Sequence, residues 1–196
     1  TLLFSATMTN EVKRLAALSL RQPVRLAADA SSAVPEKLQQ QIVRLKGAQS
    51  ALKEAHLLAL CYRSFGGGGS GTIVFFKTKQ RAHRAKILFG LAGLPLAAEL
   101  HGDMTQAARL ESLERFRKGE VAFLLATDVA ARGLDISGVE HVVNFDAPKR
   151  LESYLHRIGR TARAGAKGQA VTFIEDEDRA LLKEVVKKTG ARCKGS

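Results

Sequence analysis

Tryptophan is absent from the 196 residues, and the chain has only two cysteines, two methionines and four prolines. Cys61 and Cys193 lie far apart in unlike contexts, which excludes a disulfide framework or a cysteine-based zinc site and favours a reducing, intracellular compartment. No apolar run approaches the roughly 20 residues that a membrane-spanning helix needs, so we expect no membrane partner. Residues 1–7 also lack the basic-then-apolar order of a signal peptide.

Several motifs of catalytic and metal-binding proteins are missing too. The phosphate-binding pattern G-x-x-x-x-G-K-[ST] does not occur. The glycine-rich run 66–71 formally contains G-x-G-x-x-G, but it precedes a predicted strand instead of following one, so we predict a flexible loop. His101 and Asp103 are too sparse for a metal site, and Ser5 has no spaced histidine and aspartate that would make it a nucleophile.

Acidic residues are the minority charge: 19 Asp and Glu stand against 31 Lys and Arg, which gives a net charge of +12. Such a balance favours a polyanionic partner, although basicity alone does not separate nucleic acid from an anionic membrane or a structural role. The hydrophobic content of 45% is ordinary for a globular protein, and the length suits one sizeable α/β domain.

From residue 39 onward, short apolar runs alternate with amphipathic stretches at helical spacing. The runs predict strands at 40–45, 72–76, 96–100, 121–126, 141–145 and 169–174. The amphipathic stretches predict helices at 48–65, 80–91, 105–118, after Pro148, and at 177–188. This alternation is typical of a parallel sheet with helices on both faces, a three-layer α/β fold.

The first residues do not follow this alternating pattern. Residues 1–4 resemble the end of a buried strand, Asn10 is placed to cap a helix, and 24–27 suggest a second short strand. A piece this short cannot bury its own faces, so we assign 1–29 to the tail end of another unit. We predict a linker at 30–38 and the main domain at 39–196.

Polar residues follow the predicted strands, where open α/β sheets bind their ligands. They include Lys77–Lys79 after one strand, His101–Gln106 and Arg109 after the next, and then Thr127–Ile136 and Asp146–Pro148. Glycines let a backbone approach a phosphate, and helix N-termini direct N–H donors at it. The sequence therefore predicts one sheet edge that binds a phosphate-bearing ligand.

A second candidate for anion binding is His156–Arg163, where Arg157, Arg160 and Arg163 recur every third residue. On a continuous helix they would form one strip, and like charges at this spacing cost about 0.2–0.5 kcal/mol per pair. Gly159 within the helix would cost about another 1 kcal/mol. These penalties favour guanidinium groups held ready for phosphate over the alternative, a solvated basic face.

Taken together, these residues resemble the C-terminal RecA-like lobe of a DEAD-box RNA helicase, over nearly the whole chain. The resemblance rests on Ser5-Ala6-Thr7 (the S-A-T motif), Ile73–Thr78 (motif IV), Gln106 with Arg109, Ala126–Asp135 (motif V) and His156–Arg163 (motif VI). It implies a RecA-like parallel sheet with helices on both faces, preceded by a short piece of the first helicase lobe. Many members have glycine where this chain has Ala162, but a small residue remains.

The resemblance also implies roles for single residues. Arg160 and Arg163 would be the catalytic arginine fingers on the γ-phosphate of ATP, and Gly133 and Asp135 would help hold the nucleotide. The residues expected along the RNA backbone are Thr78, Gly102, Gln106, Arg109 and Thr127. Those expected to couple the ATP and RNA sites are Ser5, Thr7, His156 and Arg157.

The cofactor implied is ATP with Mg²⁺, and the magnesium ligands are expected in the first lobe, outside these 196 residues. The fragment alone is therefore predicted to be inactive, and its partners would be RNA, bound without sequence preference, and the first lobe of the same protein. The motif spelling is similar to the nucleolar branch that assembles large ribosomal subunits, which implies pre-ribosomal particles as partners and the nucleus as location. Two alternatives stay open: a non-catalytic RNA- or protein-binding module, and a translocase of the same superfamily that acts on DNA.

Overall fold

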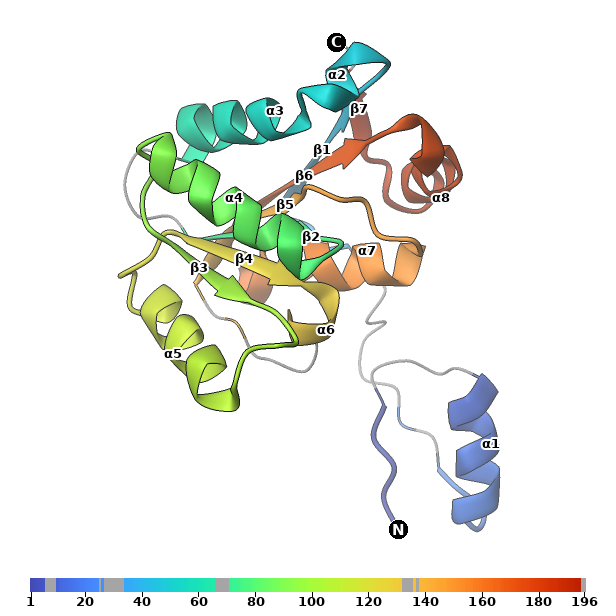
Figure 1. Ribbon diagram of the computed structural model, residues 1–196. Coiled ribbons are helices and arrows are strands. Elements are labelled where there is room, and N and C mark those ends of the chain that lie inside the picture. Colours follow the sequence, from blue (N-terminus) through green and yellow to red (C-terminus); the bar gives the residue numbers. More distant parts are fainter. Residues whose placement is uncertain are drawn as a thin grey trace. The chain divides into compact units, whose positions relative to one another are not determined.

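The computed structural model in Figure 1 describes residues 1–5, 10–24, 26, 34–65, 71–131, 136 and 138–194. The chain divides into two units, Thr1–Ala33 and Val34–Ser196. The first contains α1 (Asn10–Ser19), as predicted, with Asn10 as its first helical residue. The strand predicted at 1–4 is wrong, and Val24 and Leu26 are not in a strand either. A strand needs a neighbour to pair with, and the described part of this unit offers none.

The second unit is built on a seven-stranded sheet with the order β3-β4-β2-β5-β6-β1-β7. The strands are β1 (Leu38–Arg44), β2 (Gly71–Phe76), β3 (Ala97–Leu100), β4 (Phe123–Thr127), β5 (Val139–Asn144), β6 (Gly168–Ile174) and β7 (Arg192–Lys194). All six strand pairings are parallel. The predicted parallel α/β architecture is confirmed.

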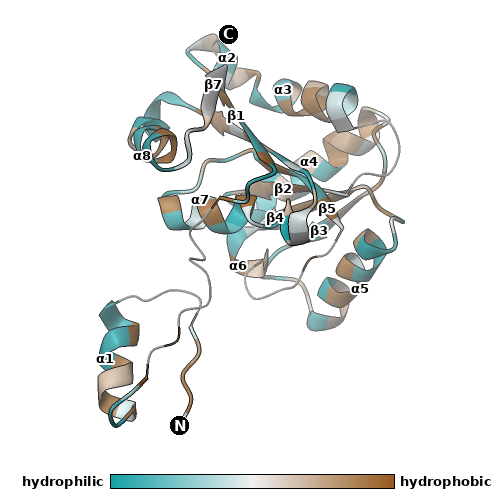
Figure 2. Ribbon diagram, turned by 180° about the vertical axis from the view of Figure 1, so that it is seen from behind, coloured by the Kyte–Doolittle hydropathy of each residue, from teal (hydrophilic) through white to brown (hydrophobic). Residues whose placement is uncertain are grey.

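Helices cover both faces of this sheet (Figure 1). On one face, α3 (Lys53–Leu60) and α4 (Lys79–Leu91) pack on a core that includes Val74, Phe76 and Phe123. The opposite core, around Ile73 and Phe75, is covered by α5 (Gln106–Arg117), α6 (Asp128–Ala131), α7 (Leu151–Ile158) and α8 (Arg179–Thr189). These helices include both hydrophilic and hydrophobic residues (Figure 2).

Strand β2 shows why the central strands read as continuous apolar runs. Successive side chains point to opposite faces, so Ile73 and Phe75 enter one core while Val74 and Phe76 enter the other. All four are at most 1% exposed. Because both faces are covered, apolar residues are favoured on both of them, and the alternating pattern of a half-exposed strand is lost.

Three predicted elements need correction. The helix predicted at 48–65 is divided into α2 (Ala48–Ala51), α3 and a π-helical turn, η1 (Cys61–Phe65). Leu38, assigned to the linker, is the first residue of β1. The C-terminal residues, which the sequence left without a structure, form β7 along Gln41–Val43 of β1. A strand of three residues, two of them charged, is too short to show the alternation by which a strand is recognised.

The arginine-bearing helix is also shorter than predicted, since α7 ends at Ile158 and Gly159 follows as its cap. Ala162 then adopts a left-handed conformation with φ 56° and ψ 31°, and a 3₁₀ turn, η2 (Arg163–Gly165), follows. The three arginines therefore do not form one helical strip. Another 3₁₀ turn, η3 (Asp176–Asp178), precedes α8, where the sequence predicted the helix to begin.

Candidate functional site

The ends of the strands are aligned, which brings the polar residues that follow them to one edge. Leu100 of β3 is level with Ala126 of β4, which is level with Phe75 of β2. Phe75 is in turn level with Asn144 of β5. Thr78 and Gly102 thus follow β2 and β3, and Thr127 ends β4, which lies between them in the sheet. We call this region the strand-end edge.

Two of the predicted RNA-contacting residues lie at helix N-termini on this edge. Thr78 caps α4, since its Oγ1 accepts a hydrogen bond from the backbone N–H of Arg81 at 3.3 Å. Thr105 caps α5 in the same way, with Ala108 as donor at 3.2 Å, and Gln106 is the first residue of that helix. Thr78, Gly102 and Gln106 are exposed. Their N–H donors and the positive ends of the helix dipoles suit an anionic ligand.

Arg109 has an additional contact that the sequence did not indicate. The residue is half-buried, and its Nη2 donates a hydrogen bond to the carbonyl of Ala130 at 3.1 Å. This bond ties α5 to the C-terminal end of α6, directly before the motif V residues 132–135. Gly133 and Asp135 lie there, outside the described residues, so their predicted contacts with the nucleotide stay predictions.

Arg157 is an internal connector and not an exposed anion ligand, because only 4% of it is accessible to solvent. Its Nε and Nη2 donate to the two carboxylate oxygens of Asp128 at 2.7 and 2.8 Å. Its Nη1 donates to Asn144 Oδ1 at 3.2 Å and to the carbonyl of Asp146 at 2.7 Å. Arg157 therefore joins α7 to the ends of β4 and β5, and its guanidinium lies 5.0 Å from the centroid of the Phe75 ring.

Arg160 and Arg163 lie beyond the end of α7. Arg160 Nε donates to the carbonyl of His156 at 3.3 Å, and Arg163 Nε donates to the carbonyl of Gly159 at 2.9 Å. Cations at this position stabilise the C-terminal carbonyls of a helix. Arg160, His156 and Asp128 also line a narrow pocket of about 20 Å³ between α6 and α7. Of the predicted coupling residues, His156 and Arg157 are thus adjacent to Arg160.

The remaining two coupling residues belong to the first unit. Ser5 is exposed in that unit, and Thr7 lies outside the described residues. Their predicted role in coupling therefore stays a prediction.

A buried ionic network under the strand-end edge was missed by the sequence analysis. Asp146 is 4% exposed and accepts hydrogen bonds from Lys53 Nζ at 3.4 Å, from Arg81 and, at 2.8 Å, from the backbone N–H of Lys77. Lys53 is 5% exposed, pairs with Glu175 as well, and lies 5.0 Å from the centroid of the Phe145 ring. Asp146 directly follows an apolar run, which was a signal for it, whereas Lys53 within a predicted helix gave none.

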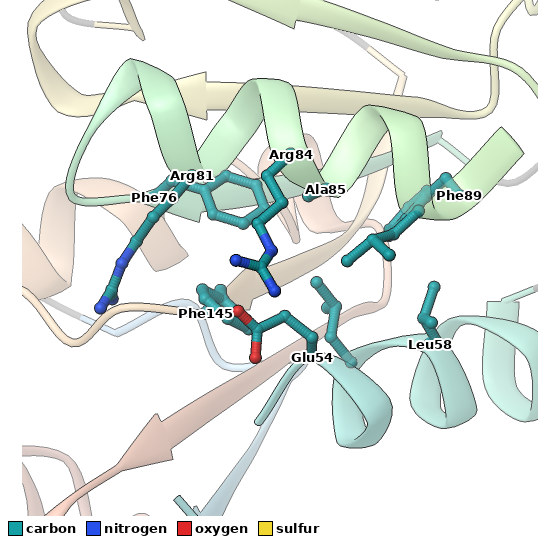
Figure 3. Close-up of a pocket in the computed structure, with 10 residues that line it drawn as sticks. Glu54, Leu58, Phe76, Arg81, Arg84, Ala85, Phe89 and Phe145 are labelled. Atoms are coloured by element: carbon teal, nitrogen blue, oxygen red, sulfur yellow. The ribbon is translucent and has the colours of Figure 1, made fainter. Parts of the chain in front are cut away.

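Figure 3 shows the seam between α3 and α4 that borders this network. Phe76 and Phe145 fill it from the sheet side, where their rings lie 5.1 Å apart, and Phe89 fills it from α4. Arg81 and Arg84 extend from α4, and Glu54 extends from α3. The seam leaves a cavity of only about 10 Å³, so it is a packed interface without room for a ligand.

The described residues also bear on two other kinds of partner, metal ions and membranes. Within the described ranges, no three histidine, cysteine or acidic side chains come close enough together to hold a metal ion. In the same part of the chain, no helix is long and apolar enough to span a membrane. The chemistry present at the strand-end edge is that of hydroxyls, backbone N–H donors and arginines, which binds phosphate groups.

Comparison with known proteins agrees with this chemistry. The family model described as "Helicase conserved C-terminal domain" matches residues 53–165. The chain is 59% identical over 194 residues to "DEAD-box ATP-dependent RNA helicase 28" of Arabidopsis thaliana. It is 50% identical over 194 residues to "Probable ATP-dependent RNA helicase ddx27" of Dictyostelium discoideum. These matches cover 99% of this chain and 24% of each relative, so the chain spans about a quarter of their length.

Solved structures show the same relationship. The E. coli DEAD-box protein SrmB, bound to regulator of ribonuclease activity A, is 37% identical with a TM-score of 0.71, over 82% of this chain and 92% of that one. S. cerevisiae Dbp5, bound to RNA and ADP BeF3, is 30% identical with a TM-score of 0.80, over 97% of this chain and 49% of that one. From the sheet, the strand-end edge and these matches, we conclude that the chain belongs to the helicase conserved C-terminal domain family and, within it, to the DEAD-box proteins.

Proposed function

We propose that this chain is the C-terminal lobe of an ATP-dependent RNA helicase. In this role it binds the RNA backbone along the strand-end edge and completes an ATP site with Arg160 and Arg163. The observation that carries the proposal is the level alignment of β3, β4 and β2, which places Gly102, Thr127 and Thr78 along one edge. The relatives named as ATP-dependent RNA helicases support it.

RNA is the proposed polyanion because the edge offers donors for phosphate and sugar. The exposed hydroxyl of Thr78, the exposed backbone at Gly102 and the N-terminus of α5 can all contact a sugar–phosphate backbone. Such contacts position a strand but carry no sequence information, so binding is expected to tolerate any sequence. The Dbp5 structure that matches 97% of this chain was determined with RNA bound.

For ATP, the proposed task of this lobe is to stabilise charge during transfer of the γ-phosphoryl group. Arg160 and Arg163 follow the end of α7, where their Nε atoms donate to the carbonyls of His156 and Gly159. Their permanent charges suit arginine fingers that approach a nucleotide held mainly by the other lobe. Asp135 and Gly133 would hold the ribose side. Mg²⁺ would supply charge neutralisation on the phosphates, with its ligands in the first lobe.

Coupling between the two sites is proposed to pass through Arg157. Arg157 makes a bidentate contact with Asp128, which directly follows Thr127, one of the predicted RNA-contacting residues. The proposed finger Arg160 lies three residues after Arg157 in the chain. A shift of α7 on ATP binding would therefore move Asp128 and the end of β4. His156, which lines the same pocket as Arg160, would act on the same path. Ser5 and Thr7 are proposed to take part in coupling as well.

We extend the proposal to ribosomal RNA processing on pre-ribosomal particles in the nucleus. The support is the motif spelling together with the relatives, among them "ATP-dependent RNA helicase drs1" of Aspergillus clavatus, which is 51% identical over 187 residues. Depletion of the protein should then cause precursors of the large-subunit ribosomal RNA to accumulate. Unchanged precursor levels would contradict this part and leave the helicase proposal intact.

The test of the proposed function is an ATP hydrolysis assay on the full-length protein and on the 196-residue chain. We expect RNA to stimulate hydrolysis by the full-length protein, and we expect no hydrolysis above background from the chain alone. Stimulation by DNA of the same sequence would favour a DNA translocase, because the 2′-OH is the group that distinguishes the two polymers. RNA binding without any hydrolysis would favour a non-catalytic binding module.

A further inference from the structure

A hollow of about 450 Å³ opens beside α4, next to the strand-end edge. One wall is the side of α4 that carries Lys79, His83, Arg84 and Ile87. The other wall is the loop after β3, with His101 and Asp103. Among the residues that the structure describes, β3 is the last strand on this side of the sheet, so the hollow lies where the strand-end edge finishes.

The apolar side chain of Ile87 in this hollow does not belong to the hydrophobic core. Helix α4 buries Ala82, Ala85 and Phe89 against the sheet. Ile87 points elsewhere and is 52% exposed, within a helix whose other exposed side chains are mostly basic. A single exposed isoleucine is ordinary in a protein surface. Here, however, it lines a hollow together with two imidazole rings, and that combination suits a flat, partly apolar ligand.

The two imidazole rings are held in place from β3. Glu99 contacts His83 Nδ1 through Oε1 at 2.9 Å and His101 Nε2 through Oε2 at 3.3 Å. His83 remains exposed, with 64% of its side chain accessible, while His101 is mostly covered at 16%. A ring fixed by hydrogen bonds to one carboxylate presents its faces without a large loss of rotamer freedom on binding. Unpaired RNA bases stack on such rings.

The rim of the hollow carries positive charge. Lys79 pairs with Asp103, and Arg84 also lines the hollow, so the charged lining side chains carry one positive charge in excess. Lys86 is 3.7 Å from Glu99 and offsets the charge of that carboxylate. The rim therefore attracts an anionic ligand, while the interior offers rings and an aliphatic side chain. A single-stranded nucleic acid combines these two features in every nucleotide.

The hollow also continues the proposed RNA path. Lys79 directly follows Thr78, and His101 and Asp103 flank Gly102, so the two proposed backbone contacts border it. We propose that this hollow binds a nucleobase of the RNA strand where the strand leaves the edge of the sheet beyond β3. The base lies against Ile87 and His83, and its phosphate faces Lys79. This subsite rests on the proposed RNA binding of the chain and extends it beyond the strand-end edge.

The test compares two uridine RNAs on the full-length protein in the presence of a non-hydrolysable ATP analogue. One has about 5 nucleotides and covers the strand-end edge alone, and one has about 12 and also reaches the hollow. The variants are Ile87→Asp and His83→Ala. The matched control is Leu91→Asp, because Leu91 lies one turn further along α4, is 81% exposed, and does not line the hollow.

We expect each hollow variant to weaken binding of the longer RNA about tenfold, as loss of one stacked base does, without affecting the shorter RNA. Leu91→Asp should bind both RNAs like the wild type. A 5-iodouridine at the end of the longer RNA that lies beyond β3 should cross-link to His83 or His101. Equal affinities of variant and wild type for the longer RNA would overturn the subsite while leaving RNA binding intact. Failure of the wild type to bind either RNA would overturn the proposed function and the subsite with it.

Discussion

Replacement of Asp146 by asparagine tests whether the buried ionic network supports the strand-end edge. The substitution keeps the size of the side chain and an oxygen that can still accept from the backbone N–H of Lys77. It removes the negative charge that faces Lys53 and Arg81. Lys53 is 5% exposed and would retain Glu175 alone, whereas Arg81 has a half-exposed side chain and can turn towards water.

The expected loss of unfolding free energy follows from this geometry. Removal of one partner from a buried ion pair costs roughly 3–5 kcal/mol. Because Glu175 still compensates Lys53, we expect the lower end, about 3 kcal/mol. At roughly 2–4 °C per kcal/mol for a domain of this size, the melting temperature should fall by about 10 °C.

The assay is urea unfolding followed by circular dichroism, together with thermal melts. The control is Asp103→Asn, which removes an exposed pair with Lys79 and should leave the unfolding free energy almost unchanged. The double variant Lys53→Met with Asp146→Asn should be more stable than the sum of the single changes predicts, since no buried charge is then left uncompensated. If Asp146→Asn costs no more than Asp103→Asn, the network does not stabilise the fold.

Three further predictions concern single residues. Ala162→Gly should raise the unfolding free energy by about 1 kcal/mol, because the left-handed conformation of Ala162 strains any side chain with a Cβ; an equal or lower stability in urea would contradict this. Burial raises the pKa of the Cys61 thiol to about 12, so iodoacetamide at neutral pH should alkylate it only after the protein unfolds. Alkylation of Cys61 in the folded protein, detected by mass spectrometry, would contradict this. At Glu99, burial alone would raise the carboxyl pKa, but the hydrogen bond from His83 and the charge of Lys86 outweigh it and lower the pKa below its ordinary 4.5. The contribution of Glu99 to stability is therefore present above that value and lost as the pH falls through the lowered pKa, so Glu99→Gln should destabilise the protein at neutral pH and cease to do so in acid.

Much of the fold was readable from the sequence because the central strands are buried on both faces. Apolar runs such as Ile73–Phe76 indicate a parallel strand that is covered on both faces. The gathering of Thr78, Gly102 and Thr127 at one edge followed, since parallel strands end on the same side of a sheet. Strand β7 could not be predicted, because it has only three residues, two of them charged, and they pair with β1 through the backbone.

The arginine region shows where local reasoning failed. The three arginines recur every third residue, which suggests one helical strip. The helix instead ends at Ile158, and Ala162 adopts a left-handed backbone conformation. Glycine is common directly after the last residue of a helix, and Gly159 has this position. The prediction from the sequence placed it inside the helix, where it would lower the stability of the helix. Arg157 was assigned a coupling role from the resemblance alone, while its partners Asp128, Asn144 and Asp146 became visible only in three dimensions.

The central claim is that this lobe completes an ATP site with arginines from beyond α7. The most direct measurement is the RNA-stimulated rate of ATP hydrolysis by the full-length protein and its Arg160→Ala variant. Arg179→Ala serves as the control, because Arg179 is an exposed arginine on α8 that pairs with Asp176. We predict a fall of about 10³-fold or more for Arg160→Ala with RNA affinity retained, and a normal rate for the control. An unchanged rate in the Arg160→Ala variant would contradict the claim.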